Sequence, residues 1–178
     1  YRQTHPLVLI PPLREPPLEP PPETDPRGHM IRDMQPEDVD ALVAIEKACF
    51  AAGYADKMMS AEDFAEVLDD PDAALFCAIE DDQVAGYAFL LFEDDAANFD
   101  SLAVSPSHQG KGIGEKLFRH VERYCEDNEI PRLNLEIKET NYSLLKRYHG
   151  YGYKCFEVEP GFYADGWGAI RMLKHFDV

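Results

Sequence analysis

Hydrophobic residues follow a helical spacing in four stretches of the chain. The first, from Gln35 to Phe50, opens with a proline and two acidic residues and then repeats apolar residues every three or four positions. Ser60-Ala61-Glu62-Asp63 has the form of a capping box and predicts a second helix, with Phe64, Val67 and Leu68 facing inward. Residues 113–126 and 141–149 are the third and fourth predicted helices; the third carries Ile113, Leu117, Val121 and Cys125 along one face.

Shorter stretches between these helices have the character of strands. Residues 133–138 alternate strictly, with Leu133, Leu135 and Ile137 on one side and Asn134, Glu136 and Lys138 on the other. Asp81-Asp82-Gln83 separates two apolar runs, which indicates a hairpin, and Ala164-Asp165-Gly166 indicates a second turn. We expect strands at residues 31–33, 74–80, 84–92, 99–104, 133–138, 153–158 and 168–176. The element order is βααββββαβαββ to within one strand, which predicts a single mixed α+β domain.

The first 29 residues differ from the rest. They contain nine of the chain's 14 prolines, and such a segment favours extended polyproline geometry rather than a packed core. Gly28-His29-Met30 resembles a cloning junction before an initiator methionine. We therefore expect residues 1–29 to be a tail, disordered or derived at least in part from cloning, and residues 30–178 to form the domain. The alternative is a natural proline-rich arm that docks on a partner.

Composition narrows the classes of partner. The formal net charge of -17 argues against nucleic-acid binding, and it either steers cationic substrates or serves solubility alone. No run of 18 apolar residues is present, so we expect no membrane span. The histidines lack metal-binding spacing, so we expect no metal. The cysteines lack CxxC spacing and indicate buried free thiols in a reducing compartment, the cytoplasm: Cys49, Cys77, Cys125 and Cys155.

Three glycines at alternate positions occur in the stretch SHQGKGIG, residues 107–114, between a predicted strand and a predicted helix. The first amides of a helix lack internal partners and carry a partial positive charge, and glycine lets an anion approach them closely. The stretch therefore predicts a pyrophosphate site with Lys111 as an added cation. It does not match GxxxxGK[ST], nor GxGxxG followed by a strand-end acid.

The residues around these glycines resemble the acetyl-CoA motif of the GNAT superfamily of N-acetyltransferases, Gln/Arg-x-x-Gly-x-Gly/Ala, which Gln109, Gly112 and Gly114 satisfy. Leu135-Glu136-Ile137, Asn141 and Tyr148 are similar to a second family motif, and the resemblance covers about residues 30–176. It implies a mostly antiparallel sheet that splays at the cofactor site, flanked by about four helices. It also implies acetyl-CoA as co-substrate, contacted by Leu102, Ala103, Val104, Gln109, Gly110, Lys111, Gly112, Ile113, Gly114 and Asn141.

The resemblance further implies that an amine attacks the thioester directly in a ternary complex. A lysine amine has a pKa of about 10.4 and an α-amine about 8, so a base must take a proton. Glu136, on the polar side of its strand, is the candidate base, acting directly or through a water. Tyr148 is the candidate acid for the leaving thiolate. Asn141 and Tyr148 are two helical turns apart and share a face, and the Val104 amide would polarise the thioester.

The resemblance leans towards the branch that acetylates protein N-terminal amines, including the ribosomal-protein-alanine acetyltransferases. In that branch the predicted acceptor-binding residues are Phe50, Tyr54 and Tyr163. The acceptor is a peptide or protein amine, or alternatively a small amine such as a polyamine, an amino acid or an aminoglycoside. A third possibility is a non-catalytic module that senses CoA. The chain is expected to be a monomer or a homodimer.

Overall fold

The computed structural model describes residues 30–52 and 58–178; the predicted tail and Tyr54 lie outside this part. The chain folds as βααβββαβαββ, with seven strands near the seven ranges expected above; the predicted order of elements held one strand too many between the second and third helices. The strands are β1 (Met30–Asp33), β2 (Ala73–Glu80), β3 (Gln83–Glu93), β4 (Ala96–Val104), β5 (Arg132–Lys138), β6 (Lys154–Glu159) and β7 (Ala169–His175). The helices are α1 (Val39–Phe50), α2 (Ala61–Asp69), α3 (Ile113–Asp127) and α4 (Tyr142–Gly150), with short 3₁₀ turns η1 (Pro36–Asp38) and η3 (Pro106–His108).

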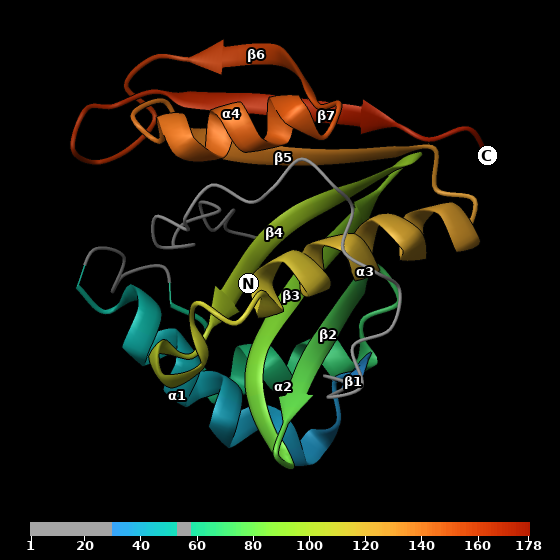
Figure 1. The fold of residues 1–178 in the computed structure, drawn as a ribbon, viewed down its shortest axis with the longest axis vertical. Coiled ribbons are helices and arrows are strands. Elements are labelled where there is room, and N and C mark those ends of the chain that lie inside the picture. The colour runs from blue at the N-terminus through green and yellow to red at the C-terminus, as the bar shows by residue number, and fades with distance from the viewer. Residues whose placement is uncertain (1–29, 53–57) are drawn as a thin grey trace.

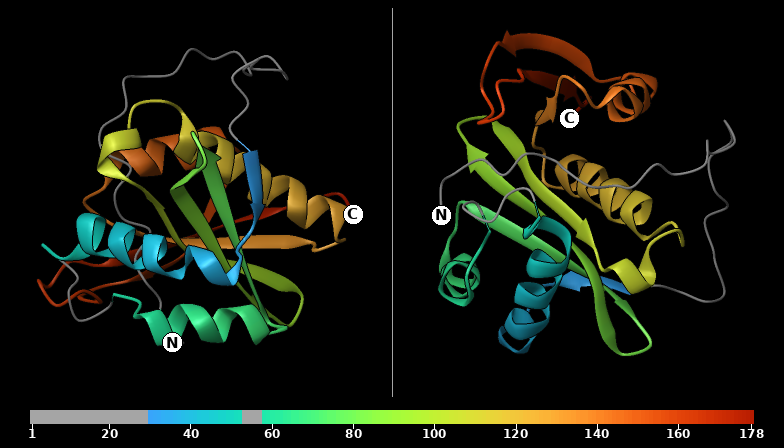
Figure 2. Two further views of the ribbon diagram at one scale, coloured as in Figure 1. Left: turned by 90° about the horizontal axis from the view of Figure 1, so that it is seen from below. Right: turned by 90° about the vertical axis from the view of Figure 1, so that its left-hand side faces the viewer.

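One seven-stranded sheet, in the order β1-β2-β3-β4-β5-β7-β6, forms the middle layer. Strands β4 and β5 run parallel, and the other described pairings are antiparallel. Helices α1 and α2 cover one face, and α3 and α4 lie on the other (Figure 2). The mixed α+β class, the mostly antiparallel sheet and the four flanking helices are therefore confirmed.

Local chemistry explains why several elements begin and end where they do. The Ser60 hydroxyl accepts a hydrogen bond from the Asp63 amide at 3.2 Å, and the Asp63 carboxylate accepts one from the Ser60 amide at 2.7 Å, which confirms the capping box. Asp81 and Asp82 both have positive φ, as a two-residue hairpin between β2 and β3 requires. The inward prediction for Leu68 is wrong, because its side chain is 37% exposed at the end of α2.

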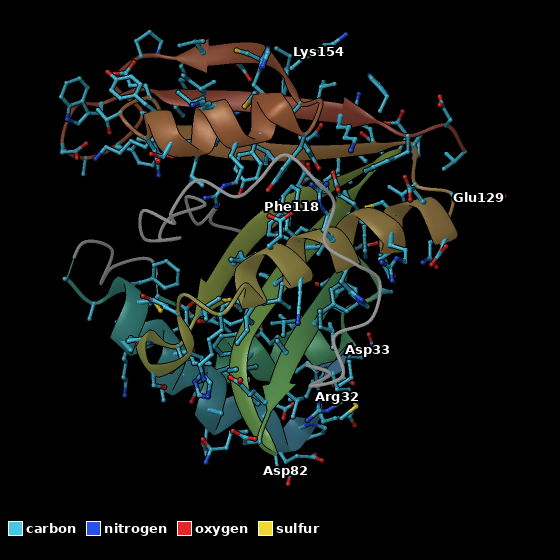
Figure 3. The ribbon with its side chains drawn as sticks, viewed as in Figure 1. Arg32, Asp33, Asp82, Phe118, Glu129 and Lys154 are labelled. Carbon is cyan, nitrogen blue, oxygen red and sulfur yellow. The ribbon has the colours of Figure 1, made fainter. Side chains whose placement is uncertain are left out.

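Two hydrophobic clusters lie on opposite faces of the sheet. One joins α3 and α4 to the sheet through residues such as Leu117, Leu135 and Tyr148, and the other joins α1 and α2 through residues such as Leu42, Phe64 and Phe89. Phe118 lies between α3 and the half of the sheet that carries α4 (Figure 3), and its ring contacts Phe99, Tyr148, Tyr151 and Tyr153. The aromatic cluster therefore ties the two halves of the sheet together on this face.

The four cysteines are free thiols, but they do not share one environment. Cys77 and Cys125 are buried, Cys49 is half-buried and Cys155 is exposed on the edge strand β6. The prediction of buried thiols is therefore wrong for Cys155. Within residues 30–52 and 58–178, no helix combines the length and apolar character needed to cross a membrane.

Candidate active site

The sheet opens between β4 and β5. These strands pair from Ala96↔Arg132 to Phe99↔Leu135 and then part, and Figure 1 shows them diverging towards their C-terminal ends. A bulge lies at the same point, because Phe89 pairs with Ser101 and Leu90 with Phe99, which leaves Asp100 without an opposite residue on β3. A bulge bends its strand and ends regular pairing. It therefore explains why the two strands separate after Phe99. The V-shaped opening between the C-terminal halves of β4 and β5 is the fork.

The glycine-rich loop leads from the end of β4 into α3. Gly110 and Gly112 have φ of 78° and 80°, a left-handed conformation that glycine adopts without strain. A Cβ added to either residue would meet no atom within 4 Å, so their backbone faces open space. The first bond of the helix runs from the Lys116 amide to the Gly112 carbonyl at 3.1 Å, and the amides before it lack intrahelical partners. The loop thus fits the phosphates of CoA, because the space beside Gly110 and Gly112 is open and the loop lies at the positive end of a helix dipole.

Most of the other residues predicted to contact the cofactor lie at the end of β4, in the glycine loop and at the start of α3, and their side chains make different contacts. The Gln109 side chain donates to the Val104 carbonyl at 3.0 Å, which holds the loop against β4. Lys111 is ion-paired with Glu80 at 3.2 Å, so a phosphate would compete with a carboxylate for this cation. Leu102, Ala103, Ile113 and Gly114 are buried, so their side chains offer a ligand little surface.

Helix α4 lies on the other side of the fork. Asn141 is its N-cap, and the Asn141 side chain accepts a hydrogen bond from the Leu144 amide at 3.2 Å. Tyr148 is 1% exposed, and its hydroxyl is buried with no hydrogen-bond partner among the described residues. Burial raises the pKa of the Tyr148 hydroxyl well above its ordinary value, so the group is neutral at physiological pH. A neutral hydroxyl without a partner has a hydrogen-bond donor that the described residues leave unused.

Glu136 lies on the opposite face of β5 from Leu135 and Ile137, which pack in the same cluster as Tyr148. The two predicted catalytic residues therefore flank the fork from opposite faces of the sheet. The Glu136 carboxylate is largely buried and accepts hydrogen bonds from the Tyr163 hydroxyl at 3.2 Å and from Arg171 Nε at 3.1 Å. It thus has a fixed orientation at the point where β5 leaves β4.

A pocket of about 200 Å³ lies beside Glu136 at the base of the fork. Asn98 and Asn134, which pair across β4 and β5, form part of its wall, and their side chains are hydrogen-bonded at 2.9 Å. Its charged lining is predominantly acidic and comprises Asp70, Asp72, Glu93, Asp100, Glu136 and Arg171. Such a lining favours a cationic ligand over an anionic one.

The three residues predicted to contact the acceptor have different outcomes. Tyr163 is 5% exposed and reaches Glu136, and the turn after it is closed by the Gly166 amide bonded to the Tyr163 carbonyl at 2.8 Å. Phe50 is 2% exposed and packs in the cluster of α1 and α2, which leaves its ring little surface to offer an acceptor. Tyr54 lies outside the described residues.

The sequence reasoning did not find Arg171. Pairing across the sheet places Arg171 opposite Glu136 on β5 and opposite Glu157 on β6, so these residues meet only once the strand order is known. The available signal was a single arginine in the predicted strand 168–176, which follows a segment that contains Glu157 and Glu159. That pattern indicates a cross-strand ion pair but not the partner.

Comparison with known proteins agrees with this geometry. Residues 39–153 match the model of the acetyltransferase (GNAT) family. A Bacillus subtilis protein named as a [ribosomal protein bS18]-alanine N-acetyltransferase is 27% identical over 135 residues, covering 76% of this chain and 87% of the relative. An N-alpha-acetyltransferase of Saccharolobus solfataricus is 26% identical over 161 residues, covering 83% and 93%.

Solved structures share the fold. The ribosomal-protein-S18-alanine N-acetyltransferase of Escherichia coli superposes with a TM-score of 0.74 at 23% identity, covering 85% of this chain and 96% of that one. The PaiA N-acetyltransferase of Thermoplasma acidophilum, solved in complex with coenzyme A, has a TM-score of 0.67 at 18% identity, covering 84% and 99%. The fork, the glycine loop and the family match lead to one conclusion: the chain belongs to the GNAT family and is an N-acetyltransferase.

Proposed function

We propose that the chain transfers the acetyl group of acetyl-CoA to a primary amine of a peptide or protein, with an N-terminal α-amine as the favoured acceptor. The position of Glu136 and Tyr148 on opposite faces of the fork carries this proposal, because it suits a donor entering from the α3–α4 side and an acceptor entering from the pocket. The names of the Bacillus, Saccharolobus and Escherichia relatives support an alanine or α-amine acceptor.

Glu136 takes the proton that the acceptor must lose before its nitrogen can attack. An α-amine has a pKa of about 8, so a substantial part arrives as ammonium at neutral pH. The acidic pocket attracts this ammonium, and the Glu136 carboxylate, held by Tyr163 and Arg171, still has lone pairs directed at other donors. The proton passes to Glu136 directly or through one water.

Tyr148 acts on the leaving group. When bound, acetyl-CoA supplies the thioester, whose C–S bond breaks as the new C–N bond forms. A thiol of this kind has a pKa near that of cysteine, about 8.5, and the Tyr148 hydroxyl has a pKa raised far above it. Tyr148 therefore stabilises the thiolate by donating a hydrogen bond. Of the two protons lost by the ammonium, one ends on the CoA thiol and one is released to solvent through Glu136.

The glycine loop holds the donor in place. Its helix amides and Lys111 bind the phosphates, and the charge needed for this is local, so it is compatible with the net charge of -17. We place the reaction in the cytoplasm, in keeping with four free thiols.

The experiment measures CoA release from acetyl-CoA with a panel of amines: peptides with free Ala, Ser or Met N-termini, the same peptides with blocked N-termini, internal-lysine peptides and spermidine. We expect turnover with a free N-terminus and none with its blocked match. Turnover with spermidine alone would move the acceptor to the small amines. Acetyl-CoA binding without turnover on any amine would contradict catalysis and favour a CoA-sensing role.

A further inference from the structure

The Glu136 carboxylate has a different donor on each oxygen. The Tyr163 hydroxyl donates to Oε1 at 3.2 Å, and Arg171 Nε donates to Oε2 at 3.1 Å. An ionised carboxylate can accept about four hydrogen bonds, so these two fix its plane and leave sites for an acceptor N–H or a water. The two contacts orient the carboxylate without closing it off.

Arg171 is itself held from the far side. Its Nη1 donates to Glu157 at 2.8 Å and its Nη2 to Glu159 at 2.7 Å, and its guanidinium lies 5.3 Å from the centre of the Phe162 ring. Each guanidinium nitrogen therefore contacts a different carboxylate. Both glutamates belong to the edge strand β6, so this strand fixes the direction of the Arg171 side chain.

The chemistry of this contact favours arginine. The guanidinium is planar and spreads its donors in a rigid fork, whereas a lysine ammonium is a single point charge that could not reach three carboxylates on two strands in the same geometry. The cluster of one guanidinium and three carboxylates also stays net negative. It therefore holds Glu136 in place without turning the pocket wall cationic, which would repel an ammonium.

We propose that Arg171 is a positioning residue for catalysis, which fixes the Glu136 carboxylate at the fork while Glu157 and Glu159 on β6 fix Arg171. This inference rests on the proposed function, in which Glu136 is the base. Misplacement of a catalytic group by about 1 Å can lower a rate about 100-fold, which is the effect this arrangement prevents.

The first test is a double-mutant cycle on kcat with Glu136→Gln, Arg171→Met and the double variant, at saturating acceptor peptide. We expect Arg171→Met to lower kcat about 10–100-fold, with an unchanged KM for acetyl-CoA, and to have no further effect once residue 136 is glutamine. An equal loss in both backgrounds would indicate a purely structural role and overturn the proposal. Arg171→Lys should retain more activity than Arg171→Met, and it replaces that variant in the cycle if Arg171→Met does not fold.

A matched control is Arg132→Met on β5, which removes an arginine whose partner is Asp95 at the rim of the sheet. We expect its kcat to match that of the wild type; a loss as large as that of Arg171→Met would overturn the specific role of Arg171.

The second test does not depend on turnover. Crystal structures of the wild type and of Arg171→Met show the position of the Glu136 carboxylate in each protein. We expect the carboxylate to lose its contact with the Tyr163 hydroxyl when the guanidinium is removed. A carboxylate that keeps this contact in the same place would overturn the proposal. Absence of acetyl transfer by the wild type on every amine would instead overturn the proposed function, and the crystal structures would still decide whether Arg171 positions Glu136.

Discussion

Replacing Tyr148 with phenylalanine should make the protein more stable and less active. The Tyr148 hydroxyl is buried and has no hydrogen-bond partner among the described residues, although its ring packs against Phe118, Tyr151 and Tyr153. A structural hydroxyl in such a place would normally be hydrogen-bonded. The unpaired group is therefore consistent with the proposed role of Tyr148 as a donor to a ligand.

The expected size of the effect follows from this environment. A buried donor without a partner costs about 1–3 kcal/mol, and phenylalanine removes the hydroxyl while keeping the ring. The free energy of unfolding should therefore rise by about 1 kcal/mol or more, which corresponds to about 2–4 °C in Tm for each kcal/mol in a domain of this size. Turnover should fall about 100-fold, the lower end of the range for removing one hydrogen-bond donor to a developing negative charge, while the affinity for acetyl-CoA stays near that of the wild type.

Urea denaturation measures the stability, and CoA release with the acceptor peptide measures kcat. Tyr153→Phe is the matched control, because the Tyr153 hydroxyl is equally buried but donates to Glu122 at 3.1 Å. It should lose about 1.5–3 kcal/mol, since its hydrogen bond is to a charged group, and keep its turnover. The reasoning is refuted if Tyr148→Phe is destabilised like Tyr153→Phe and retains full turnover.

Three further predictions concern the loop, the core and the pH dependence. Gly112→Ala should lose about 1 kcal/mol of stability and bind CoA several-fold more weakly, because residue 112 has a left-handed φ. Gly112→Asn should have a smaller effect on both. Calorimetric titration with CoA measures the affinity, and equal affinities in the wild type and the two variants would contradict the backbone argument. Glu122→Gln should lower the free energy of unfolding by about 3 kcal/mol, because this buried carboxylate accepts hydrogen bonds from Arg119, Tyr153 and Lys174. Urea denaturation measures the change, and a loss below about 1 kcal/mol would show that the cluster contributes little. Burial raises the pKa of Cys77 and of Cys125 from 9.0 to about 12, so the folded state keeps protons that the unfolded state releases. These two thiols should leave stability unchanged below about pH 9 and lower it from pH 9 to 12, and urea denaturation under reducing conditions that shows a rise over this window would contradict the assignment.

Local patterns predicted most elements, because the signals involved act over a few residues. The capping box at Ser60, the turn at Asp81 and Asp82, and the apolar face of α3 all depend on neighbours in sequence. The start of β4 was missed for the same reason. Glu93 to Ala97 reads as a polar and small-residue loop, yet Asp94 adopts a positive φ, Glu93 pairs with Ala96, and the strand begins there.

The candidate site was predicted in part. The glycine loop and the alternation around Glu136 were visible in the sequence, because one is a local backbone requirement and the other a period of two. The partners of Glu136 were not visible. Arg171 lies 35 positions further along the chain, and it meets Glu136 only because β7 pairs with β5 in one particular register.

The sequence by itself thus determined most of the order of elements, the glycine-rich loop before α3 and the polar face that carries Glu136, because these depend on contacts within a few residues. Only the tertiary structure decided where β4 and β5 separate, that the Tyr148 hydroxyl is buried without a partner among the described residues, and that Arg171 donates a hydrogen bond to Glu136. Each of these depends on strand order, register and burial. Such features arise when distant segments pack together, and no local pattern specifies them.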